Sequence, residues 1–286
     1  MSPPSGSEPE PPRLSVVFPC LDEAERLPGT LAAYLAHYPA SRGGPEGSRE
    51  PKGPEGRVPV DRWDAEGVPR SVRPEVELIV VDDGSTDGTS AVADRIAVAD
   101  QRVRVLRTAG HHGKGYAVRA GIRAAQGELV VFTDADGSYG PEQVDRVVAA
   151  LGVAPVAIGA RLGDQAGAGP PLRRLASRVF NRAMRLLLGL DFHDTQCGLK
   201  GFRREAAEAV FRRARVDGYA FDAEALLLAH RLGLEVVEVP VRAEDRAGSK
   251  VHLAGDALRM LADVWAVRRA TARGAYDEAP VRDPAG

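Results

Sequence analysis

The chain has 286 residues, enough for one large domain or two small ones. Hydrophobic residues make up 44% and charged residues 27%, which is the balance of an ordinary soluble globular protein. The formal net charge of −2 creates no global basic field, so no nucleic acid is expected as a partner. The two cysteines, Cys20 and Cys197, suit neither a disulfide framework nor a zinc site, which fits a cytoplasmic location.

The pattern of the N-terminal part predicts a strand, then a short turn and a helix, and after these a long polar segment. Residues 1–12 are rich in Pro, Ser and Glu and predict a disordered tail, since they lack the basic start and apolar core of a signal peptide. A strand is predicted over 14–19 and a helix over 22–38. Residues 39–75 bury too little apolar surface to order themselves, so we expect a flexible insertion there.

From residue 77 onward, apolar strand-like runs alternate with helical patterns. Strands are predicted over 77–81, 103–107, 128–133 and 156–160, and helices over 85–97, 115–125 and from Pro141 onward. This alternation is typical of an α/β fold with a mostly parallel, doubly wound (Rossmann-like) sheet and helices on both faces.

The last third of the chain is more helical. Helices are predicted over 172–188, 222–232 and 253–272, with an antiparallel strand over 197–202 and a further strand over 234–239. We expect one domain over 13–272, followed by a disordered tail over 273–286. No apolar stretch reaches the ~20 residues of a membrane-spanning helix, so none is predicted.

Two of the predicted strands end in closely spaced carboxylates and a glycine. Asp82 and Asp83 follow the second strand, and Asp134 and Asp136 follow the fourth. Carboxylates in this position sit where open α/β sheets bind ligands. Asp134 and Asp136 are two residues apart and project to the same side of an extended backbone, so they can hold one divalent cation on a diphosphate. A turn that favours Asp and Gly is the alternative interpretation.

Two other segments, one that begins at Asp83 and one around Lys114, can each be interpreted as a ligand-binding site or as a purely structural feature. Asp83 can accept a hydrogen bond from a ribose or a base, while Ser85 or Asp87 caps the following helix. Gly113-Lys114-Gly115 precedes a helix and can face a phosphate, but it is not a Walker loop, and no dinucleotide-binding glycine motif follows the first strand. The adjacent His111 and His112 are interpreted as loop residues.

Charged residues recur in the second half. Only four of the 38 basic residues are lysines, and Lys114, Lys200 and Lys250 each fall inside a motif-like segment, although chance placement is an alternative. Lys200 closes the segment 194–200, and Lys250 lies in a Gly-Ser-Lys turn that can act as a lid. For Asp222 the simplest interpretation is a helix cap.

A further group is basic. Arg173 and Ser177 are four residues apart and share a helix face, while Arg161 ends a strand. These three residues can bind an acceptor phosphate, or they can form a solvated basic surface.

Taken in order, the motifs resemble those of family-2 glycosyltransferases with the GT-A fold. The matching elements are V-V-F-P-C-L-D-E, V-V-D-D-G-S-T-D-G-T, G-K-G-Y-A-V-R-A-G, F-T-D-A-D-G, G-A-R, D-T-Q-C-G-L-K, Y-A-F-D-A-E and G-S-K, within about residues 14–264. The chain is most similar to the polyprenyl-phosphate branch, that is, dolichyl-phosphate β-glucosyltransferases and their mannosyl relatives. It departs from the usual pattern at Asp22, where Asn is common, and in the insertion.

The resemblance implies a role for each matching site residue. Pro19, Asp22, Glu23 and Asp83 would line the uridine pocket with Lys114 nearby, Asp134 and Asp136 would hold Mg²⁺ or Mn²⁺, Arg161, Arg173 and Ser177 would contact the acceptor phosphate, Asp194 would sit beside the reacting centre, and Lys250 would close over the leaving nucleotide. Asp194 would be a general base only for a hydroxyl acceptor, because a phosphate monoester is already largely ionised at neutral pH.

The implied activity is the metal-dependent, inverting transfer of a hexose from a nucleotide sugar, with UDP-glucose expected, to a polyprenyl phosphate. A GDP-mannose donor, a small-molecule or saccharide hydroxyl as acceptor, and nucleotide-sugar binding without turnover are the alternatives. A nucleotidyltransferase is disfavoured because the first strand lacks a Gly-rich basic loop. The last predicted helix is a candidate for peripheral contact with the inner face of the cell membrane through residues 253–273, with core packing as the alternative.

Overall fold

The computed structural model describes residues 14–38, 75–161, 182, 188–244 and 253–277. Its strands are β1 (Leu14–Cys20), β2 (Val76–Asp82), β3 (Val103–Arg107), β4 (Leu129–Phe132), β5 (Val156–Ala160), β6 (Lys200–Arg203) and β7 (Val236–Pro240). Its helices are α1 (Leu27–His37), α2 (Thr89–Ala99), α3 (Lys114–Ala124), α4 (Pro141–Ala150), α6 (Arg204–Phe211), α7 (Phe221–Arg231) and α8 (Leu253–Ala272).

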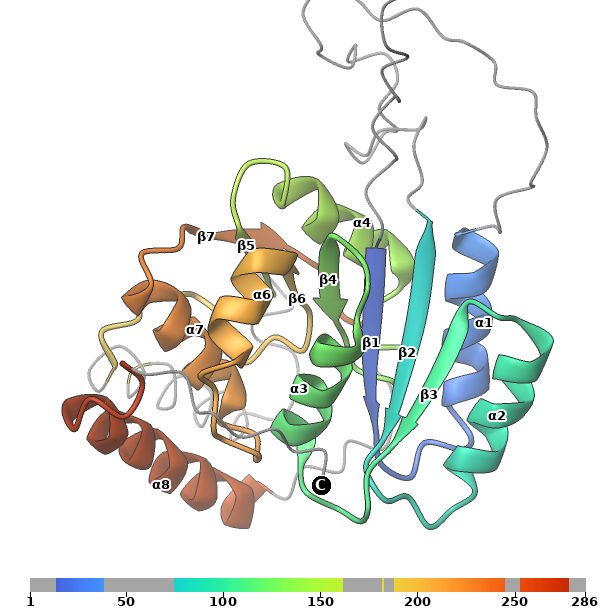
Figure 1. Ribbon diagram of the computed structural model, residues 1–286, viewed down its shortest axis with the longest axis horizontal. Coiled ribbons are helices and arrows are strands. Elements are labelled where there is room, and N and C mark those ends of the chain that lie inside the picture. The colour runs from blue at the N-terminus through green and yellow to red at the C-terminus, as the bar shows by residue number, and fades with distance from the viewer. Residues whose placement is uncertain (1–13, 39–74, 162–181, 183–187, 245–252, 278–286) are drawn as a thin grey trace, which may run out of the picture.

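The seven strands form one sheet in the order β3-β2-β1-β4-β6-β5-β7 (Figure 1). All neighbours run parallel except at β6, which lies antiparallel between β4 and β5. The predicted mostly parallel sheet and the predicted antiparallel strand are therefore both confirmed. Because β6 runs the other way, it begins at the edge where β1, β2, β4 and β5 end.

Helices cover both faces of the sheet, as predicted, because its central strands are apolar on both sides. In β1, Val17 faces a core that includes α3, α6 and α7, while Val16 faces a second core with α1 and α4. In β2, Ile79 and Leu78 divide between the two cores in the same way. A strand buried on both faces reads as a continuous apolar run, which is what the sequence shows.

The first helix begins later than predicted. Residues 21–26 form a loop in which Asp22 takes a left-handed φ of 54°, and α1 starts only at Leu27, with Pro28 in its first turn. Proline is favoured there because the first turn of a helix needs no N–H donor. The prediction of a helix from residue 22 is wrong because the backbone donors of this loop bond to a neighbouring loop instead.

The C-terminal part of the described chain differs from the expected boundaries. The short helix α6 follows β6 directly and was not predicted. Tyr276, in the segment assigned to a disordered tail, is buried, and its hydroxyl donates to Glu224 at 2.7 Å. The ordered fold therefore continues past residue 272 to Asp277. Among the described helices, none combines the length and the hydrophobicity needed to cross a membrane.

Gly121 provides a test of how closely α3 packs on the sheet. A Cβ at this position would overlap Val17 Cγ1 and lie 3.0 Å from Val81 Cγ2. We expect Gly121→Ala to lower the free energy of unfolding by about 1–3 kcal/mol, because the extra methyl group overpacks the core. Urea unfolding measures this. Gly29→Ala is the matched control: its Cβ meets nothing within 4 Å, so it should stabilise α1 by about 0.5–1 kcal/mol. Equal effects of the two substitutions would contradict the packing argument.

Candidate active site

The sheet topology brings the predicted site residues to one edge. Asp83 and Arg161 directly follow β2 and β5, Asp134 is the second residue after β4, and the segment with Asp194 leads into β6 from the same edge. This is the lower edge of the sheet in Figure 1. Ligands of open α/β sheets bind outside the carboxyl ends of the strands, so this edge is the candidate active site.

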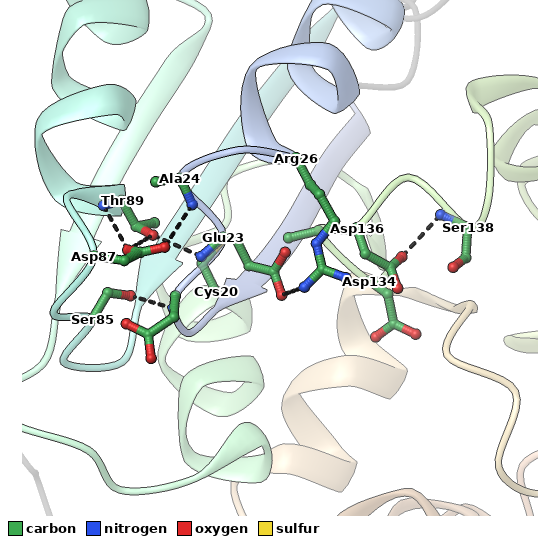
Figure 2. A network of polar contacts seen from close by, with 12 residues as sticks. Cys20, Glu23, Ala24, Arg26, Ser85, Asp87, Thr89, Asp134, Asp136 and Ser138 are labelled. Carbon is green, nitrogen blue, oxygen red and sulfur yellow. Dashed lines mark hydrogen bonds and ion pairs between the residues drawn. The ribbon is translucent and has the colours of Figure 1, made fainter. Parts of the chain in front are cut away.

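The loop after β1 is joined to the loop after β2 by backbone donors (Figure 2). The amides of Asp22, Glu23 and Ala24 donate to Ser85 Oγ at 2.9 Å, Thr89 Oγ1 at 2.7 Å and Asp87 Oδ2 at 3.0 Å. These bonds hold Asp22 and Glu23, both predicted to contact the nucleotide, beside the half-buried Pro19.

The prediction that Ser85 or Asp87 caps the helix is wrong, because the N-cap of α2 is Gly88, which has no side chain to bond to the first turn. Asp87 lies one residue before this cap, and its Oδ1 accepts from the Thr89 backbone amide at 3.0 Å. The Ser85 hydroxyl instead accepts from the Asp22 amide.

Asp83 is buried and surrounded by donors from the segment 108–113. Its carboxylate accepts from Thr108 Oγ1 at 3.0 Å and from the backbone amides of His112 at 3.1 Å and Gly113 at 2.7 Å, and it pairs with His111 Nδ1 at 2.8 Å. Asp83 therefore anchors the loop that leads to Lys114. Its predicted contact with the nucleotide stays a prediction.

The Lys114 ammonium, at the start of α3, donates to Asp134 Oδ1 at 2.5 Å. Burial by itself would lower the pKa of Lys114, but the charges of Asp134 and Asp222 outweigh it and raise this pKa above its usual value. Lys114 is therefore protonated at neutral pH. Two residues from different predicted motifs thus form one ion pair at the sheet edge.

The residues around Asp134 fit a hard divalent cation. Asp134 and Asp136 come from the loop after β4 (Figure 2), and Asp136 Oδ1 accepts from the Ser138 amide at 2.9 Å. A Cβ at Gly198 would overlap Asp134 Oδ2, so only a glycine at this position lets the carboxylate lie this close to the backbone. The Lys114 ammonium already places a positive charge on this carboxylate. The part of the chain that the structure describes has no cluster of three or more metal-binding side chains, and Mg²⁺ commonly needs only one or two carboxylates besides substrate phosphates.

Asp194 and Arg161 form a two-pronged ion pair. Arg161 Nε donates to Asp194 Oδ2 at 2.7 Å, and Arg161 Nη2 donates to Oδ1 at 3.1 Å. Burial by itself would raise the pKa of the Asp194 carboxyl, but the hydrogen bonds and charge of Arg161 lower it. A carboxylate held in this way is ionised and is a weak base.

Sequence reasoning did not assign a site role to the ion pair of Lys200 and Asp222. Lys200 is fully buried at the start of β6, and its ammonium donates to Asp222 Oδ1 at 2.6 Å and to the Cys197 carbonyl at 2.6 Å. The available signal was a lysine in an otherwise apolar strand of a chain that has few lysines. Arg173, Ser177 and Lys250 lie outside the described residues.

Comparisons with known proteins show which sequences and folds this chain is similar to. The model of the family described as Glycosyl transferase family 2 matches residues 70–211. A dolichyl-phosphate beta-glucosyltransferase of Drosophila melanogaster is 33% identical over 266 residues, which are 89% of this chain and 74% of that protein. The polyprenol monophosphomannose synthase of Mycolicibacterium smegmatis is 38% identical over 196 residues, which are 65% of this chain and 73% of that protein.

Coverage differs among other matches. The similarity to Glycosyltransferase AglD of Haloferax volcanii, 35% identical over 187 residues, spans 64% of this chain but only 30% of that longer protein. Among solved structures, glucosyl-3-phosphoglycerate synthase of Mycobacterium tuberculosis, in complex with Mn²⁺, UDP and phosphoglyceric acid, has a TM-score of 0.60 and 21% identity. That match covers 90% of this chain and 78% of the other, and it supports the fold.

The Asp194–Arg161 pair predicts a pH-dependent stability. Because the pKa of Asp194 is lowered in the folded state, the pair stabilises the protein above the unfolded pKa of about 3.9 and loses this effect as pH falls through the lower folded value. We expect Asp194→Asn to cost about 1–3 kcal/mol at pH 7, since Arg161 is partly exposed, and less below pH ~4. Urea unfolding of both proteins across this pH range measures the difference. A cost that does not change with pH would contradict the assignment.

Proposed function

This chain belongs to glycosyltransferase family 2, and we propose that it is an inverting enzyme that transfers a hexose from a nucleotide sugar to a polyprenyl phosphate. The names of its relatives support this acceptor class, since they include both a dolichyl-phosphate beta-glucosyltransferase and a polyprenol monophosphomannose synthase. We favour UDP-glucose as the donor, on the D-T-Q-C-G and F-D-A-E motifs, with GDP-mannose as the alternative.

The ion pair of Arg161 and Asp194 is the observation that supports a phosphate acceptor. A hydroxyl acceptor needs a general base, but Asp194 has a lowered pKa, and both of its oxygens accept from one guanidinium. A phosphate monoester, with a second pKa of about 6, attacks without losing a proton to the enzyme. In this proposal Asp194 orients Arg161, and Arg161 binds the acceptor phosphate together with Arg173 and Ser177.

The donor side of the site is assigned to the loops after β1, β2 and β4. Pro19, Asp22, Glu23 and Asp83 bind the nucleoside, while Lys114 and Lys250 contact the diphosphate. Asp134 and Asp136 would hold Mg²⁺ or Mn²⁺, which would offset the charge that builds on the leaving diphosphate. The presence of Mn²⁺ and UDP in the complex of the structural relative from Mycobacterium tuberculosis supports this assignment.

Contact with a membrane through α8 is part of the proposal, because a polyprenyl phosphate resides in a bilayer. Val264 and Val267 are buried against the domain, whereas Trp265 is 52% exposed and the Arg269 guanidinium lies 4.7 Å from its ring centroid. Arg268 is also exposed. An exposed tryptophan flanked by arginines suits the interface of an anionic bilayer. The inner face of the cell membrane remains the predicted location.

The proposed activity is tested with purified protein, a short polyprenyl phosphate and a panel of UDP- and GDP-sugars. We expect mass spectrometry to detect a hexosyl-phosphoryl lipid, formed most rapidly from UDP-glucose and not from the corresponding polyprenol. Transfer to the polyprenol, or to a soluble hydroxyl acceptor at a similar rate, would contradict the phosphate assignment.

Asp136→Ala tests the metal assignment. We expect it to slow transfer by about 100-fold or more while the protein stays folded, because a metal at a leaving diphosphate contributes several kcal/mol and each 1.4 kcal/mol is a factor of ten. Initial rates at saturating donor measure the loss, with the circular dichroism spectrum as the folding control. Activity like that of the wild type would remove Asp136 from the site.

Trp265→Ser tests the membrane contact. We expect it to weaken the affinity for anionic vesicles, measured by co-sedimentation, about 30-fold, since a tryptophan ring at the interface contributes on the order of 2 kcal/mol of apolar burial and each 1.4 kcal/mol is a factor of ten. Val98→Ser is the matched control, because Val98 is 87% exposed on α2, away from α8. Equal vesicle binding by the wild type and both variants would discard the α8 contact.

A further inference from the structure

Lys200 and Asp222 form a buried ion pair directly beneath the candidate active site. Lys200 is fully buried and Asp222 is 4% exposed, and the Lys200 ammonium lies 5.7 Å from the centroid of the Phe132 ring. A buried ion pair is often no more stabilising than apolar residues of similar volume. Stability alone therefore gives little reason for two charges at this place in the core.

Asp222 also acts on Lys114, which is itself paired with Asp134. The Lys114 ammonium lies 6.0 Å from the ring centroid of Phe221, the residue that precedes Asp222 at the start of α7. The negative charge of Asp222 also acts, after that of Asp134, to raise the pKa of Lys114 against the effect of burial. The pKa of Asp222 is raised by burial, although both lysines oppose this. The four side chains thus form a series of alternating charge, Lys200–Asp222–Lys114–Asp134, that runs from the core to the sheet edge.

The same pair reaches Asp134 by a second route, through the backbone. Besides Asp222, the Lys200 ammonium bonds to the Cys197 carbonyl at 2.6 Å. The next residue, Gly198, lies against the Asp134 carboxylate, where a Cβ would come within 2.7 Å of Asp134 Cγ. Lys200 therefore holds in place the backbone that borders the carboxylate.

We propose that Asp222 and Lys200 are a positioning pair for the donor site, which keeps Lys114 and the backbone at Gly198 arranged so that Asp134 can accept a divalent cation. The proposal rests on the proposed function and adds residues that contact neither donor nor acceptor. A cation on Asp134 repels the Lys114 ammonium. Asp222 is then the carboxylate that retains Lys114 in the site, where its charge can meet a diphosphate oxygen.

The double variant Asp222→Asn/Lys200→Met tests this proposal. Replacing Asp222 alone would leave a buried ammonium without its carboxylate and could unfold the protein, whereas the double variant removes both charges together. The control is Glu77→Gln/Arg104→Met. It removes a buried carboxylate and its cation, 2.7 Å apart, near the opposite end of β2.

Titration calorimetry gives the affinity for Mn²⁺ in the presence of UDP and the affinity for UDP without metal, and thermal unfolding reports stability. We expect the double variant to keep a thermal midpoint close to that of the wild type and to bind Mn²⁺ about 10–100-fold more weakly, the range seen when groups that orient metal ligands are lost. Its metal-free affinity for UDP should not fall, because the removed pair has no net charge. Transfer assays should show a lower kcat, while the control variant behaves like the wild type in every assay.

Two results would overturn the proposal. One is a folded double variant that binds Mn²⁺ as tightly as the wild type. The other is a parallel loss of thermal stability, Mn²⁺ affinity and metal-free UDP affinity, which indicates that the pair only maintains the fold. Failure of the proposed function is distinct, since the wild type itself would then bind no Mn²⁺ with UDP or transfer no hexose.

Discussion

At the carboxyl edge of this sheet, each of three aspartates is matched by a cation from another element, and these charges are partly or fully shielded from water. Asp134 after β4 pairs with Lys114 of α3, Asp194 pairs with Arg161 after β5, and Asp222 of α7 pairs with Lys200 of β6. An unpaired charge in such surroundings is costly, so these pairs fix how the loops and helices meet. They also leave the site with both signs of charge close together. The proposed binding of a donor diphosphate and an acceptor phosphate depends on this arrangement.

The antiparallel strand β6 makes this arrangement possible. A parallel strand between β4 and β5 would bring its C-terminal end to the edge, and the preceding segment would lie at the far side of the sheet. Because β6 runs in the opposite direction, the segment from Asp194 to Leu199 reaches the edge before the strand begins, and Gly198 meets Asp134. The same reversal places Lys200 beneath the edge rather than at the opposite end of the strand.

Much of the fold could be predicted from the sequence, because strands buried on both faces leave uninterrupted apolar runs. The runs of β3 and β5 predicted their bounds to the residue, and family motifs predicted the GT-A fold that the structural relatives share. The start of α1 could not be predicted. There, the amides of residues 22–24 bond to side chains more than 60 positions away, and no local pattern reports such a partner.

The sequence by itself determined which types of residue lie at the ends of the predictable elements. These are the carboxylates after β2 and β4 and the Gly-Lys-Gly segment before α3. Only the tertiary structure decided their pairing: that Asp83 anchors a loop, that Asp194 is held by Arg161, and that Lys200 pairs with Asp222. The physical reason is separation along the chain. The periodicity of strands and helices depends on neighbouring residues, whereas the partner of a buried charge comes from whichever distant segment the sheet topology brings within hydrogen-bonding distance.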